Sequence, residues 1–360
     1  MTSKQVNVYD FSLPGLVDWF ATLGEPAYRA KQLYRHLYVL RTGDWDAMTD
    51  FSKPLRQQLA DQAQLGCLKP VKRLEGDHGL TRKMLWSLPD GAPVETVLMI
   101  YPDRATVCVS SQSGCPMQCV FCATGKLGFL HDLTPGEIIE QVMWAERELA
   151  DFRAQATASP SPPSKLTNIV FMGMGEPFNN YDQWWTSVER LHDPAGYDMG
   201  ARNFTVSTVG LVPGILRLAD APLPINLAIS LHAADDETRS EMMPVNKRYP
   251  IEELIAATRT YTEKTRRRVS FEYVLLKEKN DFPEQAARLG QLLRPEGAPP
   301  LLCHVNLIPW NPVPGTPLGR SDRNRVLRFQ AALRACGVPC TVRVERGVDI
   351  AAACGQLAGA

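Results

Sequence analysis

No apolar run in this chain of 360 residues approaches the roughly 20 residues that a membrane-spanning helix requires. The first residues, MTSKQVNVYDFSLPG, also lack the basic and then apolar pattern of a signal peptide. Net charge is absent too, because 39 Lys and Arg balance 39 Asp and Glu. We therefore expect a cytoplasmic protein without a membrane partner, in which any nucleic acid must meet a local basic patch.

A fourth cysteine is missing from the most distinctive motif, CPMQCVFC, which contains Cys115, Cys119 and Cys122. Nine cysteines in a reducing compartment indicate metal binding or catalysis before structural disulfides. Structural zinc takes four ligands. If Cys336 and Cys340 supplied two of them, only two cysteines of the motif would bind zinc and the third would have no role. A 4Fe-4S cluster held by three cysteines leaves one iron free to bind a small molecule. The motif therefore favours the cluster, with zinc as the alternative.

Apolar, β-rich runs alternate with amphipathic helical segments from about residue 105 onward. Six runs have this character, ATVCVSS, TNIVFMG, NFTVSTV, INLAISL, RVSFEYVLL and CHVNLI, and TVRVERG follows a last helix expected at 321–336. Such alternation predicts parallel βαβ units, arranged as a whole or partial α/β barrel or as a doubly wound sheet. Both architectures gather their chemistry at the carboxyl ends of the strands.

Composition divides the chain into four predicted parts. Residues 1–67 carry apolar residues at helical spacing and form an accessory helical domain. Residues 68–104 form a β-hairpin linker, TRKMLWSLPDGAPVETVLMIY, that turns at Pro-Asp-Gly. The α/β core spans 105–345, and 346–360 form a tail. The Ala/Ser/Pro-rich stretch at 153–165 is expected to be a flexible surface insertion.

Polar residues and glycines recur where the predicted strands end. Within GMGEP, the glycines permit close backbone approach and Glu176 offers a carboxylate to an ammonium group. The other candidates are Gly175, Ser207, Ser230, His232 and Asn311. Each is weak alone, but their shared position at one rim predicts a small-molecule site beside the three cysteines.

The spacing Cys-x3-Cys-x2-Cys, with Phe121 before the last cysteine, resembles the signature of radical S-adenosylmethionine enzymes. ATVCVSSQSGCPMQCVFCATGKLGF, FMGMGEP, SLHAADDETRSEMMPVNKRYPIEEL, HVNLIPWNPVPG and VDIAAACGQLAG together resemble the RlmN/Cfr family of RNA adenine methyltransferases, and RRVSFEYVLL favours the RlmN branch. The resemblance implies an α/β fold, a partial (β/α)6 radical-SAM barrel with a small helical N-terminal domain and a short β-hairpin extension.

The resemblance also implies the cofactors and their ligands. Cys115, Cys119 and Cys122 would hold the 4Fe-4S cluster, and two molecules of S-adenosylmethionine would be consumed per turnover. The residues expected to bind S-adenosylmethionine are Gly175, Glu176, Ser207, Ser230, Leu231, His232 and Asn311.

The implied chemistry runs through the tail. Carbon 2 of adenine is electron-poor and cannot attack a sulfonium methyl group as a nucleophile, so a radical route is required. One S-adenosylmethionine would methylate Cys354, and a 5′-deoxyadenosyl radical from the second would take hydrogen from that methyl group. The methylene radical would then add to the base. Glu95 matches the family's proton acceptor, and Cys108 matches the thiol that releases the product by forming a transient disulfide with Cys354.

The resemblance names 23S rRNA, and the adenine beside some tRNA anticodons, as substrates. It also implies an external electron donor such as flavodoxin, and we expect a monomer. Two alternatives stay open, a Cfr-type enzyme that methylates carbon 8 and brings antibiotic resistance, and a non-catalytic zinc-bound RNA module. Candidate RNA contacts are Arg29, Lys31, Arg35 and Arg41 with Tyr28, Tyr34 and Tyr38, and the KTRRR segment at 264–268.

One position departs from the family pattern. The family commonly has Asp-Ile-Asp before Ala-Ala-Cys, whereas this chain has Asp349-Ile350-Ala351. We expect this change to tune the conformation of the tail and to leave the reaction the same.

Overall fold

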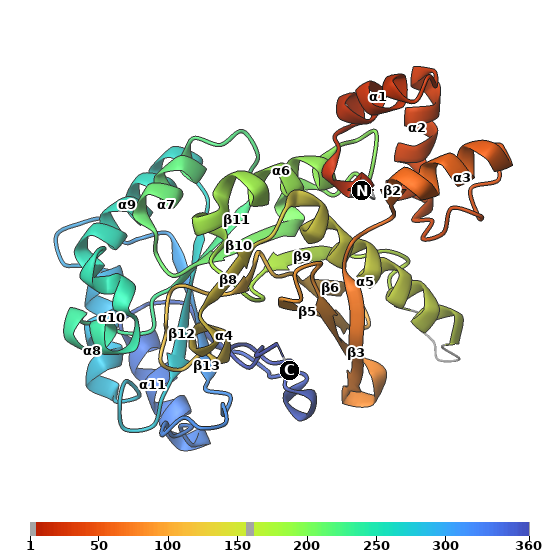
Figure 1. Cartoon of the computed structure of the whole chain (residues 1–360). Coiled ribbons are helices and arrows are strands. Elements are labelled where there is room, and N and C mark those ends of the chain that lie inside the picture. The colour runs from red at the N-terminus through yellow and green to blue at the C-terminus, as the bar shows by residue number, and fades with distance from the viewer. Residues whose placement is uncertain (1–4, 156–161, 360) are drawn as a thin grey trace.

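A ten-stranded sheet forms the centre of the computed structural model, which describes residues 5–155 and 162–359 (Figure 1). Neighbouring strands follow the order β14-β13-β12-β11-β10-β9-β6-β5-β4-β3. The strands from β14 to β6 are parallel. Their bounds are β6 Ala105–Cys108, β9 Asn168–Phe171, β10 Phe204–Thr208, β11 Asn226–Ser230, β12 Val269–Leu275, β13 Cys303–Pro309 and β14 Cys340–Val342.

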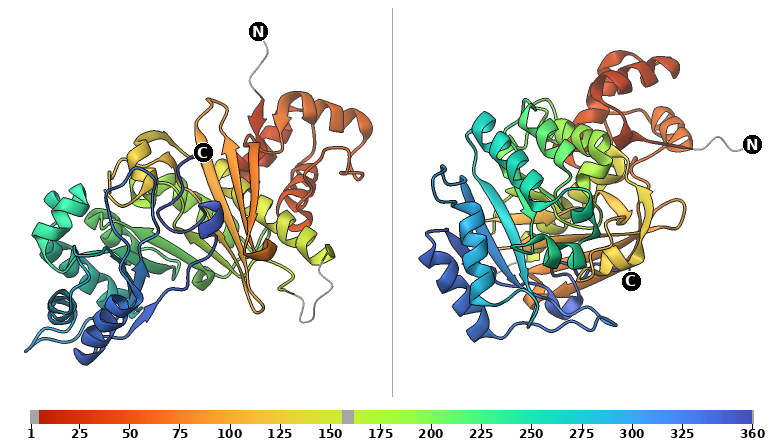
Figure 2. Two further views of the ribbon diagram at one scale, coloured as in Figure 1. Left: turned by 90° about the horizontal axis from the view of Figure 1, so that it is seen from below. Right: turned by 90° about the vertical axis from the view of Figure 1, so that its left-hand side faces the viewer.

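Helices connect successive parallel strands and lie around the outside of the curved sheet (Figures 1 and 2). They are α5 Pro135–Gln155, α6 Tyr181–His192, α7 Val212–Ala219, α8 Asp236–Met242, α9 Ile251–Thr265, α10 Pro283–Leu293 and α11 Arg323–Ala335, with the 3-10 turns η4 Pro177–Asn180, η5 Ala201–Asn203 and η6 Pro244–Lys247. This arrangement confirms the predicted partial barrel over the doubly wound sheet, which carries helices on both faces. Within the described ranges, no helix is both long and apolar enough to cross a membrane.

Sequence signals account for the start of α5. The Thr134 Oγ accepts a hydrogen bond from the Glu137 N–H (3.2 Å), and the Glu137 carboxylate accepts one from the Thr134 N–H (2.9 Å). This reciprocal pair is a capping box, and Pro135 occupies the first turn. The helix ends at Gln155, and residues 156–161 of the predicted insertion lie outside the described residues.

An antiparallel extension continues the sheet beyond β6. Its strands are β3 Lys69–Gly76, β4 Thr81–Ser87 and β5 Pro93–Ile100, with the turn η3 Asp77–Gly79 between β3 and β4. The predicted hairpin corresponds to β4 and β5, but the third strand, β3, was missed. Its sequence KPVKRLEG is almost wholly exposed, so it carries no alternation of apolar and polar residues.

The N-terminal residues form the expected small helical module. It contains α1 Leu13–Thr22, α2 Ala27–Arg35, the π-turn η2 His36–Leu40 and α3 Lys53–Gln62, preceded by η1 Val8–Asp10 and tied by the short parallel pair β1 Val6–Asn7 and β2 Ala63–Gln64. The helices enclose Leu16, Phe20, Leu33 and Leu37, which are fully buried. Burial of one apolar stripe from each helix stabilises the module.

A buried carboxylate on α5 joins this module to the sheet. Glu140 accepts hydrogen bonds from the Asn7 side chain (2.6 Å) and from the backbone N–H groups of Cys67 and Leu68 (2.8 and 2.9 Å). Burial raises the pKa of Glu140 to about 7. The Glu140 carboxylate therefore holds both Asn7, near the start of the module, and Cys67 and Leu68, just after its last strand, against one turn of α5.

A second, two-stranded sheet frames the three-cysteine loop. Strands β7 Gln112–Gly114 and β8 Phe129–Asp132 pair on either side of the loop, which also contains α4 Ala123–Leu127. The Cys115 N–H donates to the Gly128 carbonyl (2.8 Å). Gly114 has φ +69°, and a Cβ added to it would lie 1.8 Å from that carbonyl oxygen. Only glycine fits this position.

We predict that Gly114→Ala destabilises the protein much more than Gly128→Ala. Both glycines have positive φ, which costs an alanine about 1–2 kcal/mol. A Cβ at Gly128 would meet nothing within 4 Å, whereas one at Gly114 would displace backbone, adding about 1–3 kcal/mol. Urea unfolding of the two variants checks this, and equal losses of unfolding free energy would contradict it.

Candidate active site

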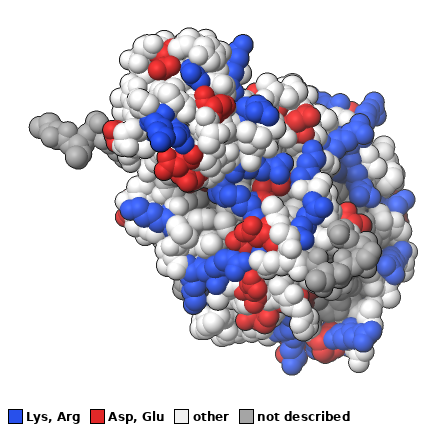
Figure 3. Space-filling model, turned by 90° about the vertical axis from the view of Figure 1, so that its right-hand side faces the viewer, with Lys and Arg blue, Asp and Glu red and all other residues white. Residues whose placement is uncertain are grey.

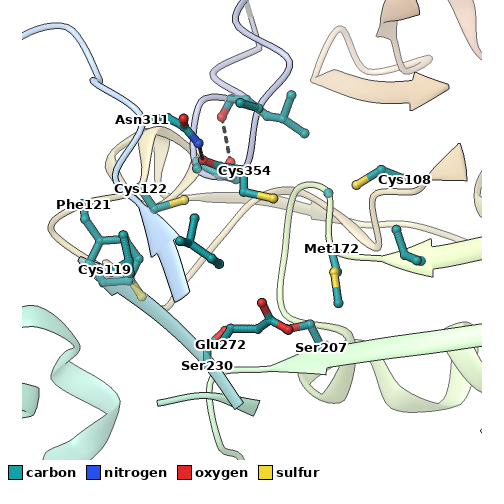
Figure 4. A pocket seen from close by; sticks show the side chains of 18 of the residues that line it. Cys108, Cys119, Phe121, Cys122, Met172, Ser207, Ser230, Glu272, Asn311 and Cys354 are labelled. Atoms are coloured by element: carbon teal, nitrogen blue, oxygen red, sulfur yellow. Dashed lines mark hydrogen bonds between the residues drawn. The ribbon is translucent and has the colours of Figure 1, made fainter. Parts of the chain in front are cut away.

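A pocket opens at the carboxyl ends of the parallel strands, and most of the predicted site residues line it (Figure 4). Eleven of the thirteen do so: Cys108, Cys115, Cys119, Cys122, Gly175, Glu176, Ser207, Ser230, His232, Asn311 and Cys354. They come from strand ends, from the cysteine loop and from the C-terminal tail. The parallel strands and the tail thus bring together residues as far apart in the sequence as Cys108 and Cys354.

The three cysteines of the loop face one side of the pocket. Burial raises the pKa of the Cys115 thiol to about 12 and that of Cys119 well above its usual value. A positively charged metal group offsets such a penalty by binding the thiolate. Among the described residues, no three His, Cys, Asp or Glu side chains converge on a point that suits one metal ion. A cubane, which takes each cysteine on a different iron, fits this spacing better than zinc does.

Glu176 is held rigidly at the pocket wall. Its two carboxylate oxygens accept hydrogen bonds from the N–H groups of Phe178 (3.1 Å) and Val209 (2.7 Å). Burial raises the pKa of this carboxyl to about 7. Beside it, a Cβ on Gly175 would lie 2.6 Å from Gln112, which explains the glycine. Each carboxylate oxygen still has acceptor capacity for an ammonium group.

His232 is fixed as a neutral donor. It has a left-handed backbone conformation (φ +60°) directly after β11, and its Nδ1 accepts the Val274 N–H at 3.0 Å. Burial lowers the pKa of His232 to about 3. The neutral ring therefore carries its proton on Nε2. Phe121, the aromatic residue before Cys122, packs edge-to-face against the imidazole, with ring centroids 4.8 Å apart.

Two buried oxygens of the pocket wall lack a hydrogen-bond partner within the described protein. They are Oδ1 of Asn311, which has no partner there, and Oε2 of Glu272, whose nearest cation is the Arg343 guanidinium at 3.5 Å; the two residues are 3% and 4% exposed. Ser230 on β11 pairs with Glu272 on β12, and Ser207 lies on the next strand, β10 (Figure 4). Buried polar atoms without partners are costly unless a ligand satisfies them. This wall therefore fits a polar small molecule such as S-adenosylmethionine.

Hydrogen bonds to backbone carbonyls of the tail hold the tail over the pocket. The Asn311 side-chain amide donates to the Cys354 carbonyl (3.1 Å), and the Ala123 N–H donates to the Gly355 carbonyl (2.8 Å). Thr124 then donates its hydroxyl to the Leu357 carbonyl (2.7 Å). Because two of these three donors belong to the helix that follows Cys122, the cysteine loop and the tail order each other.

Cys354 and Cys108 point their sulfur atoms into the same pocket (Figure 4). Cys354 is exposed to the cavity, Cys108 is buried on β6, and both carry free thiols. Burial raises the pKa of Cys108 to about 12, and the neighbouring Cys354 adds to this shift. The Cys354 thiol is therefore near enough to influence the ionisation of Cys108.

Two predicted site residues do not line the pocket. Leu231 is fully buried in the hydrophobic core, because strand alternation turns its side chain away from that of Ser230. Glu95 is also fully buried, pairs with Lys83 (2.9 Å) and accepts the Ala358 N–H (3.1 Å). Burial raises the pKa of Glu95. Its carboxylate lies under the tail and not on the pocket wall.

Sequence reasoning missed four charged residues of the pocket, Glu272 on β12 and Arg343, Glu345 and Arg346 after β14. Asn306 donates to Oε1 of Glu272 (2.8 Å), and Nη1 of Arg343 lies 3.5 Å from Oε2. Glu272 is the single carboxylate in the apolar strand VSFEYVL. Burying a charged side chain in an apolar strand costs free energy, so such a residue often has a function. The lone glutamate in this strand could have been noticed in the sequence.

The predicted RNA contacts are only partly accessible. Tyr34 and Tyr38 are core residues of the helical module, so their rings cannot stack on a base, whereas Tyr28 is 54% exposed. Arg41 pairs with Glu146 (3.1 Å). Figure 3 shows Lys, Arg, Asp and Glu intermixed over the face that carries this module. No residue of 264–268 lines the pocket. The segment directly precedes β12, so it lies at the amino ends of the parallel strands, away from the carboxyl ends where the pocket opens.

The remaining cysteines mostly behave as the predicted core thiols. Cys67, Cys303 and Cys340 are buried, while Cys336, at the end of α11, is half-buried.

We predict that the ionisation of Glu176 makes the stability of the protein fall as pH rises. Its folded pKa of about 7 exceeds the ordinary value of 4.5 for a glutamate, so the folded state binds the proton more tightly. Between these values the unfolding free energy should decrease by up to about 3 kcal/mol with rising pH. Glu176→Gln should flatten this slope in urea unfolding from about pH 5 to 7.5. Glu140→Gln, which removes a carboxyl of similar pKa far from the pocket, should flatten it comparably. A Glu176→Gln slope equal to wild type would contradict the assignment.

We predict that Ala351→Asn stabilises the tail. Ala351 has φ +50° at the end of η7 Val348–Ile350, a conformation that Asn adopts more readily than Ala. Hydrogen exchange of the amides at 352–358 should slow by about threefold, and Ala351→Val should accelerate it. Unchanged exchange in both variants would show that this position does not control the tail.

Comparison with known proteins agrees with this site. One family model, described as ribosomal RNA large subunit methyltransferase N-terminal domain, matches residues 6–65, and another, described as radical SAM superfamily, matches 109–290. Two relatives are named probable dual-specificity RNA methyltransferase RlmN. The one from Chloroflexus aurantiacus is 62% identical over 359 residues, 99% of this chain and 93% of the relative. The one from Roseiflexus sp. is 58% identical over 384 residues, covering 98% and 96%.

A crystal structure agrees as well. The radical SAM methyltransferase from Sphaerobacter thermophilus is 49% identical and superimposes with a TM-score of 0.92, covering 99% of this chain and 100% of that one. These similarities confirm the predicted α/β partial barrel and the enzyme class, and they set the zinc module aside. The family's cofactors are a 4Fe-4S cluster and S-adenosylmethionine. The chain belongs to the RlmN family of radical SAM RNA methyltransferases.

Proposed function

We propose that this enzyme methylates carbon 2 of an adenine in 23S rRNA and of the adenine next to the anticodon in tRNAs. The observation that carries the proposal is the meeting of Cys354 and Cys108 in the pocket of the three loop cysteines. An enzyme that transferred a methyl group directly from S-adenosylmethionine to a nucleophilic atom would need neither thiol. The names of the relatives support two RNA substrates, and such substrates imply action in the cytoplasm.

The chain supplies distinct groups for each stage. Cys354 accepts the first methyl group on its sulfur, and Glu176, Ser207, Ser230, His232 and Asn311 hold S-adenosylmethionine. When bound, the cluster and a second S-adenosylmethionine supply the radical that activates the methyl group. The carbon of that group then joins the adenine, which ties the RNA to Cys354. Gly175 and the loop cysteines complete the cofactor site.

Release of the product uses two further groups. Glu95 takes the proton from carbon 2 of the adenine. Cys108, as a thiolate, attacks the sulfur of Cys354, so the carbon–sulfur bond breaks as a disulfide forms between the two cysteines. The methylene carbon takes up a proton to become the methyl group, and the unpaired electron of the adduct would return to the cluster. The disulfide is reduced by cytosolic thiols before the next turnover. One electron enters from an external donor such as flavodoxin, and a single copy of the chain contains all of these groups.

Anaerobic incubation with methyl-labelled S-adenosylmethionine and transcribed 23S rRNA fragments tests the proposal. Label should appear first on Cys354 and then on adenine, and Cys354→Ala should abolish both, because no other residue carries the methyl group. Mass spectrometry of the nucleosides should identify 2-methyladenosine. A methyl group on carbon 8 would assign a Cfr-type activity, and label on adenine with Cys354→Ala would overturn the proposal.

Cys108→Ala should block release without blocking attachment. The variant lacks the thiol that takes the tail sulfur, so labelled RNA should accumulate as a covalent adduct at Cys354. Cys336→Ala removes a half-buried thiol outside the pocket and should turn over normally. Free methylated RNA from Cys108→Ala at the wild-type rate would contradict the role of Cys108.

A further inference from the structure

The chain after β14 crosses from one end of the large sheet to the other. The Arg343 N–H still pairs with β13 through the Leu307 carbonyl (2.9 Å), and the Gly347 N–H reaches the Asp77 carboxylate (2.9 Å) in η3, which joins β3 and β4. Residues 343–346 between these points line the pocket. Val344 among them is 88% exposed. The pocket therefore meets solvent along this crossing segment.

Two arginines brace a tyrosine at the same border. Tyr101 lines the pocket at the end of β5, and its N–H donates to the Arg104 carbonyl (2.8 Å) in the turn that leads to β6. The guanidinium of Arg104 lies 4.0 Å from the centroid of the Tyr101 ring, and that of Arg346 lies 4.5 Å from it. The Tyr101 ring therefore contacts two cations from distant segments of the chain, as cation–π interactions favour.

The charges around these arginines are unbalanced. Arg343 lies 3.5 Å from Glu272, and Glu345 pairs with Arg320. Within residues 5–155 and 162–359, neither Arg104 nor Arg346 has a carboxylate within ion-pair distance. Asp103, exposed in the same turn, is the nearest carboxylate in sequence. The border of the pocket thus presents two guanidinium groups that an anionic partner can satisfy.

We propose that Arg104 and Arg346 bind the RNA phosphates that flank the adenine entering the pocket. This inference rests on the proposed function. An adenine reaches the loop cysteines only after it leaves its stack, and its neighbouring phosphates then lie at the pocket border. Guanidinium groups bind phosphates strongly and without regard to sequence. The contact therefore serves rRNA and tRNA substrates alike.

Salt-dependent binding of the full-length enzyme to a transcribed 23S rRNA fragment tests this contact. Arg104→Ala and Arg346→Ala should each weaken binding and reduce the slope of log K against log salt concentration by about 1. Arg104→Lys should retain most of the slope, because the charge remains. Arg328→Ala, which removes an exposed arginine from α11, should match wild type.

A second readout separates phosphate binding from support of the tail. Methylation of Cys354 in the absence of RNA should proceed normally in Arg104→Ala and Arg346→Ala. Loss of this methylation in Arg346→Ala would mean that Arg346 supports the tail, and would overturn its proposed contact. Wild-type affinity and slope in both variants would overturn the inference and leave the proposed function intact. If the wild-type enzyme itself neither bound nor methylated the fragment, the proposed function would fail first.

Discussion

Hydrogen bonding from the cysteine loop to the C-terminal tail is the constraint on which the site depends. The Ala123 N–H and the Thr124 hydroxyl, one and two residues after Cys122, donate to carbonyls at Gly355 and Leu357. These contacts use the tail's backbone, so they fix its path independently of most tail side chains. The geometry of three cysteines and that of a fourth, more than 200 residues later, are therefore set together.

The antiparallel extension gives the tail its second anchor. Lys83 on β4 donates to the Ala351 carbonyl (3.2 Å) and pairs with Glu95 on β5, whose other oxygen accepts the Ala358 N–H. The extension thus connects the tail to the strand next to Cys108. The tail also covers Glu95, so under the proposed function proton transfer to this residue would require residues 351–358 to move. The tail is held at this end by hydrogen bonds, which can break and re-form, as the proposed function requires of a segment that carries a methyl group and later releases a base.

Sequence reasoning succeeded best where the same local residue pattern, an apolar strand followed by a polar end, recurs along the chain. Strand ends could be read from apolar runs, and parallel topology then predicted that Ser207, Ser230 and Asn311 share one rim. It was weaker where position depends on distant contacts. Leu231 was named only through the family resemblance, and strand alternation turns its side chain into the core. Strand β3 was missed because its exposed residues show no period. The burial of Glu95 under the tail depends on a contact over 263 positions, which no local pattern reveals.

Oxidation of the cluster-loaded enzyme, followed by mass-spectrometric mapping of disulfides, tests this placement of the tail most directly. Cluster binding protects the three loop thiols, so the thiols left facing the pocket are those of Cys108 and Cys354. The account predicts that mild oxidation joins these two in one peptide pair. A tail thiol that pairs with the half-buried Cys336 outside the pocket, or that forms no bond to Cys108, would contradict it.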